Sequence, residues 1–511
     1  MKISGAALSK IDRESDLYRS LEKVHQRIAE KDPQTWGKKA SAEAAIRLNW
    51  VDLPHTSTDL LPELAELAKR FETHTRVVLC GMGGSSLGPE VIAKTFSKEL
   101  FVFDSTDPEY AEHALAGDLT RTVVIVSSKS GSTIETASQR AIFEATFTAA
   151  GIEPRDQIVI VTDPHSPLDK EARASGFTVI NADPNVGGRF SVLSAFGLTP
   201  AALIGAPVGE LLAQAQAEKS FFLTNPHSVI DVAYAFAAIA SQYVAFTDHG
   251  SAVPGLSDWI EQLIAESTGK EGTGRLPIAT ESLAEAQIGG SFTVAYSANG
   301  ADLVVEGPLG AHFIFWEWVT ALLGFALNID PFNQPNVTEA KEQTSAALAE
   351  WNNQIPVLTP NASEGYVEIF GDGQTLKDAL ATFIEGIRDG GYISIMAYLD
   401  RIEDAKIAEL RSILARKANR PTQFGWGPRF LHSTGQFHKG GQPNGSFLQI
   451  TAETESDIAI PGREFGLRTL IFAQAIGDNK TLAKRKYPLL RLHLQNRRAG
   501  IDQILAAARS L

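Results

Sequence analysis

Residues 121–128 read RTVVIVSS, and residues 129–151 continue as KSGSTIETASQRAIFEATFTAAG. The first run is apolar and β-branched, whereas the second begins as a polar turn and continues with a helical pattern. The same order recurs upstream, where TRVVLC (75–80) leads into GMGGSSLGPEVIAKTF (81–96). Continuously apolar strands that alternate with helices predict a parallel sheet covered on both faces.

The rest of the chain repeats this alternation. Strand-like runs follow at 99–105 (ELFVFDS), 157–163 (QIVIVTD) and 177–183 (FTVINAD), which makes five strands for the first sheet. Long apolar helices with short strands come next, and the last third of the chain again alternates strands and helices. The predicted parts are an N-terminal helical segment at 1–44, a first α/β domain at 45–205, a second at 206–360 and a C-terminal α/β subdomain at 361–511.

The composition excludes several classes of protein. The chain has 511 residues, of which 44% are hydrophobic and 21% charged, as in ordinary globular proteins. Its formal net charge is -14, so bulk attraction would not hold it to nucleic acid or to an anionic membrane, and we expect neither partner. The single cysteine, Cys80, excludes an intrachain disulfide and a thiolate metal cluster.

The most apolar stretch runs from Leu309 to Asp330 and could be mistaken for a membrane span. It carries His312 and Glu317 in its first half, and ionisable groups are costly in hydrocarbon. We therefore predict a buried core helix there. The N-terminal residues show no apolar core of signal-peptide length, so we expect a soluble, cytoplasmic protein.

Two turns at strand ends could bind an anion. The turn at 127–133 brings together five hydroxyls and one lysine where a helix begins, whereas a helix cap needs only one hydroxyl. The glycine-rich turn, with Gly84 and Ser85, is either a tight connection or a place where backbone approaches a ligand. Because both turns follow strands of one parallel sheet, they mark its ligand crevice.

A third candidate is the stretch DPNVGGRFSVLS (183–194). Two glycines before Arg189 allow close backbone approach and a fixed guanidinium, although an isolated arginine is more often part of a surface ion pair.

These motifs resemble the phosphoglucose isomerase family. The resemblance covers about 45–350 and rests on GMGGSSLGP, SSKSGSTIET and above all NVGGRFSVLSAFGLTPAALIG (185–205). WIEQLIAESTGKEGTG, followed by LPIATES, resembles the region of the catalytic glutamate, and NIDPFNQPNVTEAK the segment of the catalytic lysine. Residues 370–511, with FGWGPRFLHSTGQFHKGG, look like the isomerase half of bacterial transaldolase–phosphoglucose isomerase fusions, and we expect no transaldolase half.

The resemblance implies a fold and a set of site residues. The fold is two sugar-isomerase-type, doubly wound parallel-sheet domains with a C-terminal α/β subdomain. The implied catalytic residues are the base Glu281 (second choice Glu266), Arg189 to steady the enediolate, Lys341, and a ring-opening histidine. The implied binding residues are Gly84, Ser85, Ser128, Lys129, Ser130, Ser132, Thr133, Gln334 and His432. For the histidine, His438 is preferred over His432, and His312 is interpreted as a core residue.

The implied activity is the interconversion of glucose 6-phosphate and fructose 6-phosphate by a cis-enediol proton transfer. One carboxylate can move the proton and a cation can offset the enediolate charge, so we expect neither cofactor nor metal. The expected partner is a small sugar phosphate, and a homodimer is among the assemblies that the resemblance allows. The alternatives are an isomerase of another anionic aldose, such as mannose 6-phosphate or a sulfonated sugar, and a phosphosugar-binding regulator.

Overall fold

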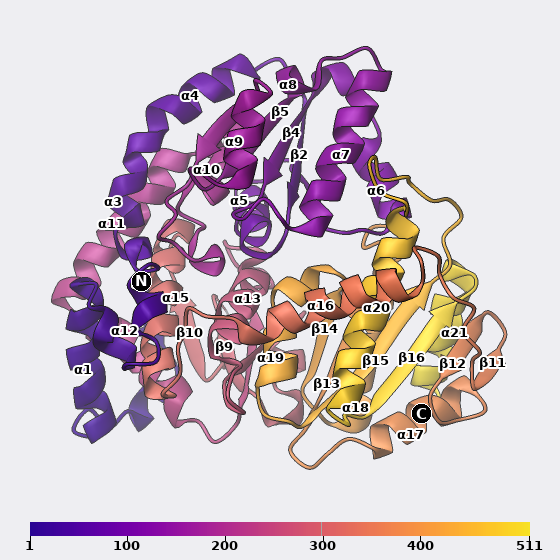
Figure 1. Ribbon diagram of the computed structural model, residues 1–511. Coiled ribbons are helices and arrows are strands. Elements are labelled where there is room, and N and C mark those ends of the chain that lie inside the picture. Colours follow the sequence, from indigo (N-terminus) through magenta and orange to yellow (C-terminus); the bar gives the residue numbers. More distant parts are fainter. Residues whose placement is uncertain (298) are drawn as a thin grey trace. The chain divides into compact units, whose positions relative to one another are not determined.

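The computed structural model describes residues 1–297 and 299–511 (Figure 1). The chain forms two compact units, each described here by itself. The first unit comprises Met1–Asp104, Leu115–Ala286 and Phe292–Asn333, and the second comprises Ser105–Ala114, Gln287–Ser291 and Gln334–Leu511. The domain boundaries given above remain predictions.

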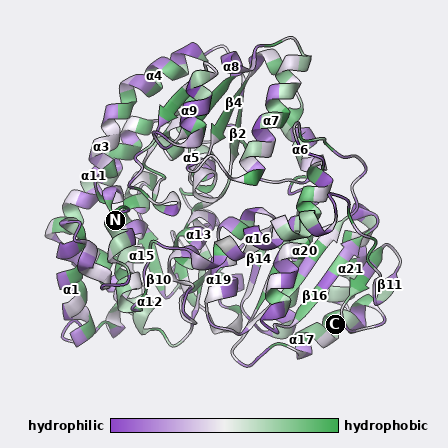
Figure 2. Cartoon of the chain, viewed as in Figure 1, coloured by the Kyte–Doolittle hydropathy of each residue, from purple (hydrophilic) through white to green (hydrophobic). Residues whose placement is uncertain are grey.

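The first sheet has the predicted five parallel strands, in the order β3-β2-β4-β5-β6. They are β2 (Arg76–Gly81), β3 (Phe101–Phe103), β4 (Thr122–Ser127), β5 (Ile158–Thr162) and β6 (Thr178–Asn181). Their residues are almost all buried, and Figure 2 shows β2 and β4 as hydrophobic. Cys80 lies within β2 and is fully buried, and burial raises the pKa of its thiol.

Helices cover both faces of this sheet, as predicted. Val77 and Leu79 of β2 pack in one cluster with Phe196 of α10 (Ala195–Leu203). On the other face, Phe143 of α7 (Ile134–Ala149) lies against Phe103 of β3. The shorter connecting helices include α5 (Leu87–Thr95), α8 (Pro154–Gln157) and α9 (Pro167–Ala174).

The second sheet of the first unit has the order β1-β10-β9-β7-β8. Its strands are β1 (Lys2–Ser4), β7 (Tyr243–Thr247), β8 (Leu276–Ala279), β9 (Phe292–Ala295) and β10 (Leu303–Glu306). All pairs are parallel except β1 with β10. Strand β1 lies at the start of the segment 1–44, which was predicted to be helical, because three residues paired to a sheet edge leave no periodic signal.

Helix α15 (Leu309–Ala326) forms the centre of the first unit. It is long and apolar enough to cross a membrane, yet 89% of its residues are buried inside the protein. Trp316 and Trp318 are fully buried in the main core cluster, and α11, α12 and α13 contact this helix. The predicted buried core helix is confirmed. The helices around it are α1 (Asp16–Ala29), α2 (Ser41–Ala44), α3 (Leu53–Thr56), α4 (Leu61–Arg70), α11 (Val208–Thr224), α12 (His227–Ala238), α13 (Leu256–Thr268) and α14 (Leu283–Ala286).

The second unit contains a six-stranded sheet in the order β11-β12-β16-β15-β13-β14. The four strands from β16 to β14 are parallel, and β12 and β11 extend the sheet antiparallel. The strands are β11 (Ala362–Glu364), β12 (Val367–Phe370), β13 (Tyr392–Ala397), β14 (Thr422–Trp426), β15 (Gly445–Ala452) and β16 (Leu489–Leu494). The helices are α6 (Pro108–Leu115), α16 (Pro335–Glu350), α17 (Leu376–Glu385), α18 (Glu409–Ala418), α19 (Gly435–Gly440), α20 (Leu467–Lys484) and α21 (Arg497–Arg509).

The two faces of this sheet differ in polarity. Leu490, Leu492 and Leu494 of β16 belong to an apolar core cluster. Arg491 and His493 alternate with them along β16, so they lie on the opposite face. The mixed α/β architecture predicted from the sequence is present in both units.

Candidate active site

The hydroxyl-rich turn, residues 127–133, connects β4 to α7. Thr133 occupies the N-cap position of α7, and its side chain makes no capping hydrogen bond. Ser128 is buried and its Oγ accepts a hydrogen bond from the backbone nitrogen of Gly131 at 3.1 Å. Ser130 and Ser132 are exposed, with their hydroxyl oxygens 2.9 Å apart. The uncapped helix start and the exposed hydroxyls can receive an anion from solvent.

Lys129 ties this turn to its neighbours. Its Nζ lies 2.5 Å from Asp163 Oδ2, in the loop after β5, and donates to the carbonyl oxygen of Pro184 at 3.1 Å. Burial lowers the pKa of Lys129 and raises that of Asp163. Because its charge is already paired, Lys129 fits a bracing role between three loops better than that of a free phosphate-binding cation.

The glycine-rich turn lies directly against the turn that carries Arg189. A β-carbon at Gly84 would lie 2.0 Å from the carbonyl oxygen of Gly188, so only glycine allows the two backbones to approach this closely. Ser85, next to Gly84, is half-buried. The two motifs, about a hundred residues apart in sequence, thus form one structural feature.

Arg189 is buried and held by several partners, which excludes the surface ion pair considered for it. Its Nε donates to Ser267 Oγ at 2.7 Å, and its Nη2 donates to the carbonyl oxygens of Pro331 at 2.5 Å and Asn333 at 3.1 Å. Its Nη1 lies 3.4 Å from Glu266 Oε1. The guanidinium is therefore fixed in place beside a carboxylate.

Glu266 and Lys270 complete this cluster. Glu266 lies in the last turn of α13 and is buried, and its Oε2 accepts a hydrogen bond from Gln262 at 3.1 Å. Lys270 Nζ donates to the carbonyl oxygen of Asp330 at 2.5 Å and to Asn333 Oδ1 at 2.9 Å. Burial and the nearby charge of Arg189 hold the pKa of Lys270 well below its usual range. Lys270 was not predicted as a site residue from the sequence, although it stands four residues after Glu266 in the string ESTGK.

Glu281 does not belong to the cluster of Arg189, Glu266 and Lys270. It is exposed in the turn after the carboxyl end of β8. Glu266 lies at the end of α13, which leads into the amino end of β8, whereas Glu281 follows the carboxyl end of β8. The two glutamates therefore lie at opposite ends of this strand. The geometry therefore favours Glu266, the second choice from the sequence, over Glu281 as the base.

The remaining predicted residues belong to the second unit. Gln334 occupies the N-cap position of α16, and Lys341 is exposed on that helix. His432 is half-buried in a short 3₁₀ helix that precedes α19.

His438 does not lie in a glycine-rich loop, as the sequence suggested, but on helix α19. It is buried, with Tyr392 Oη 2.9 Å from its Nδ1 and Ser394 Oγ 3.2 Å from its Nε2. Burial holds its pKa well below the usual value. With both ring nitrogens occupied, His438 fits a structural role better than that of a ring-opening acid. His312 is also buried, and burial lowers its pKa to about 3, in accord with a core residue.

Comparisons with known proteins agree with these motifs. The family model described as Phosphoglucose isomerase matches residues 67–295. The chain is 30% identical over 271 residues to a glucose-6-phosphate isomerase of Campylobacter jejuni, covering 51% of this chain and 65% of that protein. It is 28% identical over 269 residues to a probable glucose-6-phosphate isomerase of Haloquadratum walsbyi, covering 50% and 61%. The chain thus spans less than two thirds of the length of these relatives.

Solved structures show a related fold. A hypothetical protein of Thermus thermophilus superposes with a TM-score of 0.60 at 24% identity, covering 68% of this chain and all of that one. A glucose-6-phosphate isomerase of Chlamydia trachomatis superposes with a TM-score of 0.53 at 19% identity, covering 69% and 89%. At these identities the likeness concerns the fold alone.

Proposed function

The chain belongs to the phosphoglucose isomerase family, and on that premise we propose that it interconverts glucose 6-phosphate and fructose 6-phosphate. The observation that carries this proposal is the buried pair of Glu266 and Arg189, 3.4 Å apart. An aldose–ketose isomerase needs one base that moves a proton between C2 and C1, and a cation beside the enediolate oxygens. The pair supplies both.

In this mechanism Glu266 takes the proton from C2 of the open-chain aldose and returns it to C1. The negative charge that develops on the enediolate is stabilised by Arg189, whose other nitrogens are already fixed by Ser267 and by two carbonyl oxygens. Because the guanidinium is held before substrate arrives, no reorganisation is needed during the reaction. Lys270 belongs to the same cluster, because it donates to the carbonyl oxygen of Asn333 that Arg189 also contacts.

The phosphate group is assigned to the hydroxyl-rich turn, residues 127–133. Its exposed hydroxyls and the uncapped start of α7 provide hydrogen-bond donors for an anion. We assign the bracing role to Lys129, and substrate contacts to Ser128, Ser130, Ser132 and Thr133. Gly84 lets the glycine-rich turn pack against the turn that carries Arg189, and we propose that the backbone of Gly84 and Ser85 contacts substrate there.

Ring opening is assigned to His432 rather than His438, because His432 is half-buried and therefore within reach of a substrate. Histidine is the side chain most often used as general acid and base, the two roles that ring opening requires. We also propose, from the resemblance, that Gln334 binds substrate and that Lys341 is catalytic. We further propose a role in glycolysis and gluconeogenesis and a cytoplasmic location.

A coupled assay on three substrates tests the proposal: glucose 6-phosphate, mannose 6-phosphate and a glucose sulfonated at C6. We expect glucose 6-phosphate to be turned over fastest. Preference for either other sugar would favour the alternative isomerases, and tight binding without turnover would favour a phosphosugar-binding regulator.

Two matched variants locate the base. Glu266→Gln keeps the shape of the side chain but removes its basicity, and loss of a general base typically slows turnover about 10²–10⁴-fold. Glu281→Gln makes the same chemical change on an exposed turn and should leave turnover within about twofold. The opposite pattern would return the role to Glu281.

A further inference from the structure

The second unit contains a pocket that the isomerase chemistry does not use. It has a volume of about 550 Å³, within the range of small-molecule sites. The polar face of the sheet forms its floor, with Phe370, Arg491 and His493, and the start of α20 forms one wall, with Phe472. The segment 353–358 forms another part of the lining.

Arg491 is the unusual member of this lining. Only 6% of the residue is exposed, and within residues 1–297 and 299–511 no hydrogen bond or ion pair reaches its guanidinium. Its Nη1 is sealed from solvent without a partner. The guanidinium carbon lies 3.4 Å from the centre of the Phe370 ring. Burial lowers the pKa of Arg491 to about 10, which leaves it positively charged at neutral pH.

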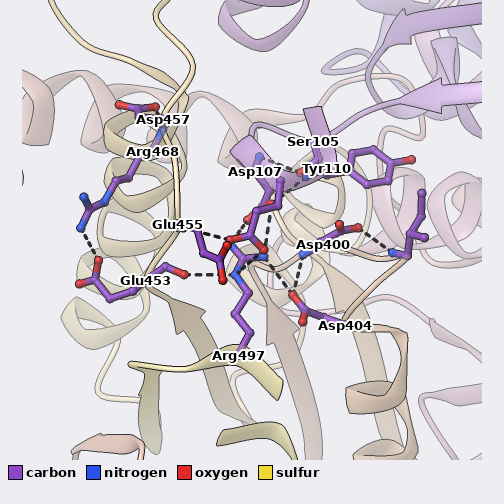
Figure 3. Close-up of polar contacts among 12 residues, drawn as sticks. Ser105, Asp107, Tyr110, Asp400, Asp404, Glu453, Glu455, Asp457, Arg468 and Arg497 are labelled. Atoms are coloured by element: carbon purple, nitrogen blue, oxygen red, sulfur yellow. Dashed lines mark hydrogen bonds and ion pairs between the residues drawn. The ribbon is translucent and has the colours of Figure 1, made fainter. Parts of the chain in front are cut away.

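The other charged groups of the pocket already have partners. Arg468 pairs with Glu453, and Asp457 accepts a hydrogen bond from the backbone nitrogen of Arg468 at 2.8 Å, which caps α20 (Figure 3). Glu368 accepts a hydrogen bond from Gln495 at 2.9 Å. Burial lowers the pKa of His493, so this ring is neutral at pH 7. The charge of Glu368 acts on Arg491 from nearby without forming an ion pair, so among the described residues of the pocket the guanidinium has no direct anionic partner.

The chemistry of the missing partner follows from this balance. A buried charge without a partner lowers the stability of the protein. Binding of an anion that pairs with this charge would therefore be favourable. The acidic side chains of the same lining disfavour a dianion, whereas a single carboxylate matches the planar edge of a guanidinium. Phe370, Phe472 and Ile471 offer apolar and aromatic surface to the rest of the ligand.

We propose that this pocket binds a small organic monocarboxylate with an apolar or aromatic body, and that Arg491 pairs with its carboxylate. The site is separate from the proposed isomerase residues and does not depend on their assignment.

The test uses the full-length protein and 4-fluorobenzoate, observed by ¹⁹F NMR, with neutral 4-fluorobenzamide as the matched probe. Inorganic phosphate is kept in excess to occupy the hydroxyl-rich turn. We expect saturable binding of the benzoate at millimolar concentration or below, and at least tenfold weaker binding of the benzamide. Equal binding of both probes, or no binding of either, would overturn the proposal without any variant.

A pair of variants then locates the probe. Arg491→Gln should weaken benzoate binding at least tenfold, while Arg463→Gln, on an exposed loop, should change it less than twofold. The melting temperature of Arg491→Gln should change little, because the loss of its contact with the Phe370 ring is offset by removal of a buried charge that has no ion-pair partner among the described residues. Undiminished binding to Arg491→Gln would place the probe elsewhere and refute the assignment.

Discussion

Glu266 Oε1 lies 3.4 Å from Arg189 Nη1, and both residues are buried. The two residues stand 77 positions apart in sequence, on the last turn of α13 and in the turn after β6. A carboxylate and a cation enclosed in this way interact more strongly than they would in water, which suits the proton transfer proposed for them. The first prediction concerns the cation of this pair.

Arg189→Lys should keep the charge but lose most of the fixed contacts to Ser267, Pro331 and Asn333, because lysine has no planar fork of donors. We expect turnover to fall about 10²–10³-fold, the usual loss when one oxyanion donor is removed. Steady-state kinetics measures this, with Arg173→Lys as the control at an exposed arginine that also pairs with a carboxylate. Equal turnover in both variants would mean that Arg189 only supports the fold.

The hydroxyl-rich turn should govern substrate affinity. Thr133→Val and Ser128→Ala each remove a hydrogen bond to a charged group, worth about 1.5–3 kcal/mol, so KM should rise about tenfold or more. Thr148→Val, near the other end of α7, is the control, since its hydroxyl bonds only within the helix. Inorganic phosphate should compete with substrate in the parent protein. An unchanged KM together with no inhibition by phosphate would show that this turn only begins helix α7 and does not bind substrate.

The two histidines of the second unit should behave differently. His432→Asn should slow turnover of the cyclic sugar while leaving proton exchange on an open-chain analogue nearly unchanged. His438→Asn should chiefly lower the melting temperature, because it disturbs hydrogen bonds to Tyr392 and Ser394 in a buried site. If His438→Asn instead slows only the cyclic substrate at unchanged stability, the roles are reversed.

Gly84→Ala should destabilise the protein by about 1–3 kcal/mol, because its β-carbon would lie 2.0 Å from the carbonyl oxygen of Gly188. Gly209→Ala is the matched control within helix α11, where the nearest atom is 3.9 Å from the new carbon. There alanine should stabilise by about 0.5–1 kcal/mol. Chemical denaturation measures both changes, and the same sign for both would contradict the close approach of the two turns.

Acid should destabilise the fold in part through His25. This side chain is buried against Phe222 and Trp318, and burial lowers its pKa to about 4. The unfolded chain, with a pKa near 6.5, binds the proton more readily, so stability falls as the pH drops from about 6.5 to about 4. The loss from His25 alone is about 3 kcal/mol. His25→Phe should flatten the pH dependence of the unfolding free energy over this range, and an unchanged slope would show that His25 does not contribute.

The sequence predicted the regular parts of the fold well and the long-range contacts poorly. The five strands of the first sheet were predictable because each is a short apolar run bounded by polar turns. Lys2–Ser4 was not, since its strand exists only through pairing with residues 304–306. Local pattern carries no information about a partner three hundred residues away.

The same distinction holds within the candidate site. Arg189 was recognisable from its two preceding glycines, but its bonds to Pro331 and Asn333 depend on tertiary packing. Glu266 and Glu281 both stood in the relevant stretch of sequence. To prefer one of them as the proposed base required knowing that α13 leads back to the amino end of β8. This path places the two carboxylates at opposite ends of that strand.

Cys80, enclosed in the middle of β2, has a practical consequence for spectroscopy. Its thiol is fully buried and its raised pKa disfavours the reactive thiolate, so alkylating labels will leave it untouched in the folded protein. Cysteines introduced at the exposed positions Ile46 and Ile402 can therefore carry a fluorophore or spin-label pair without removal of the native residue. The distance between such labels, followed as sugar phosphate is added, would report any change in their separation.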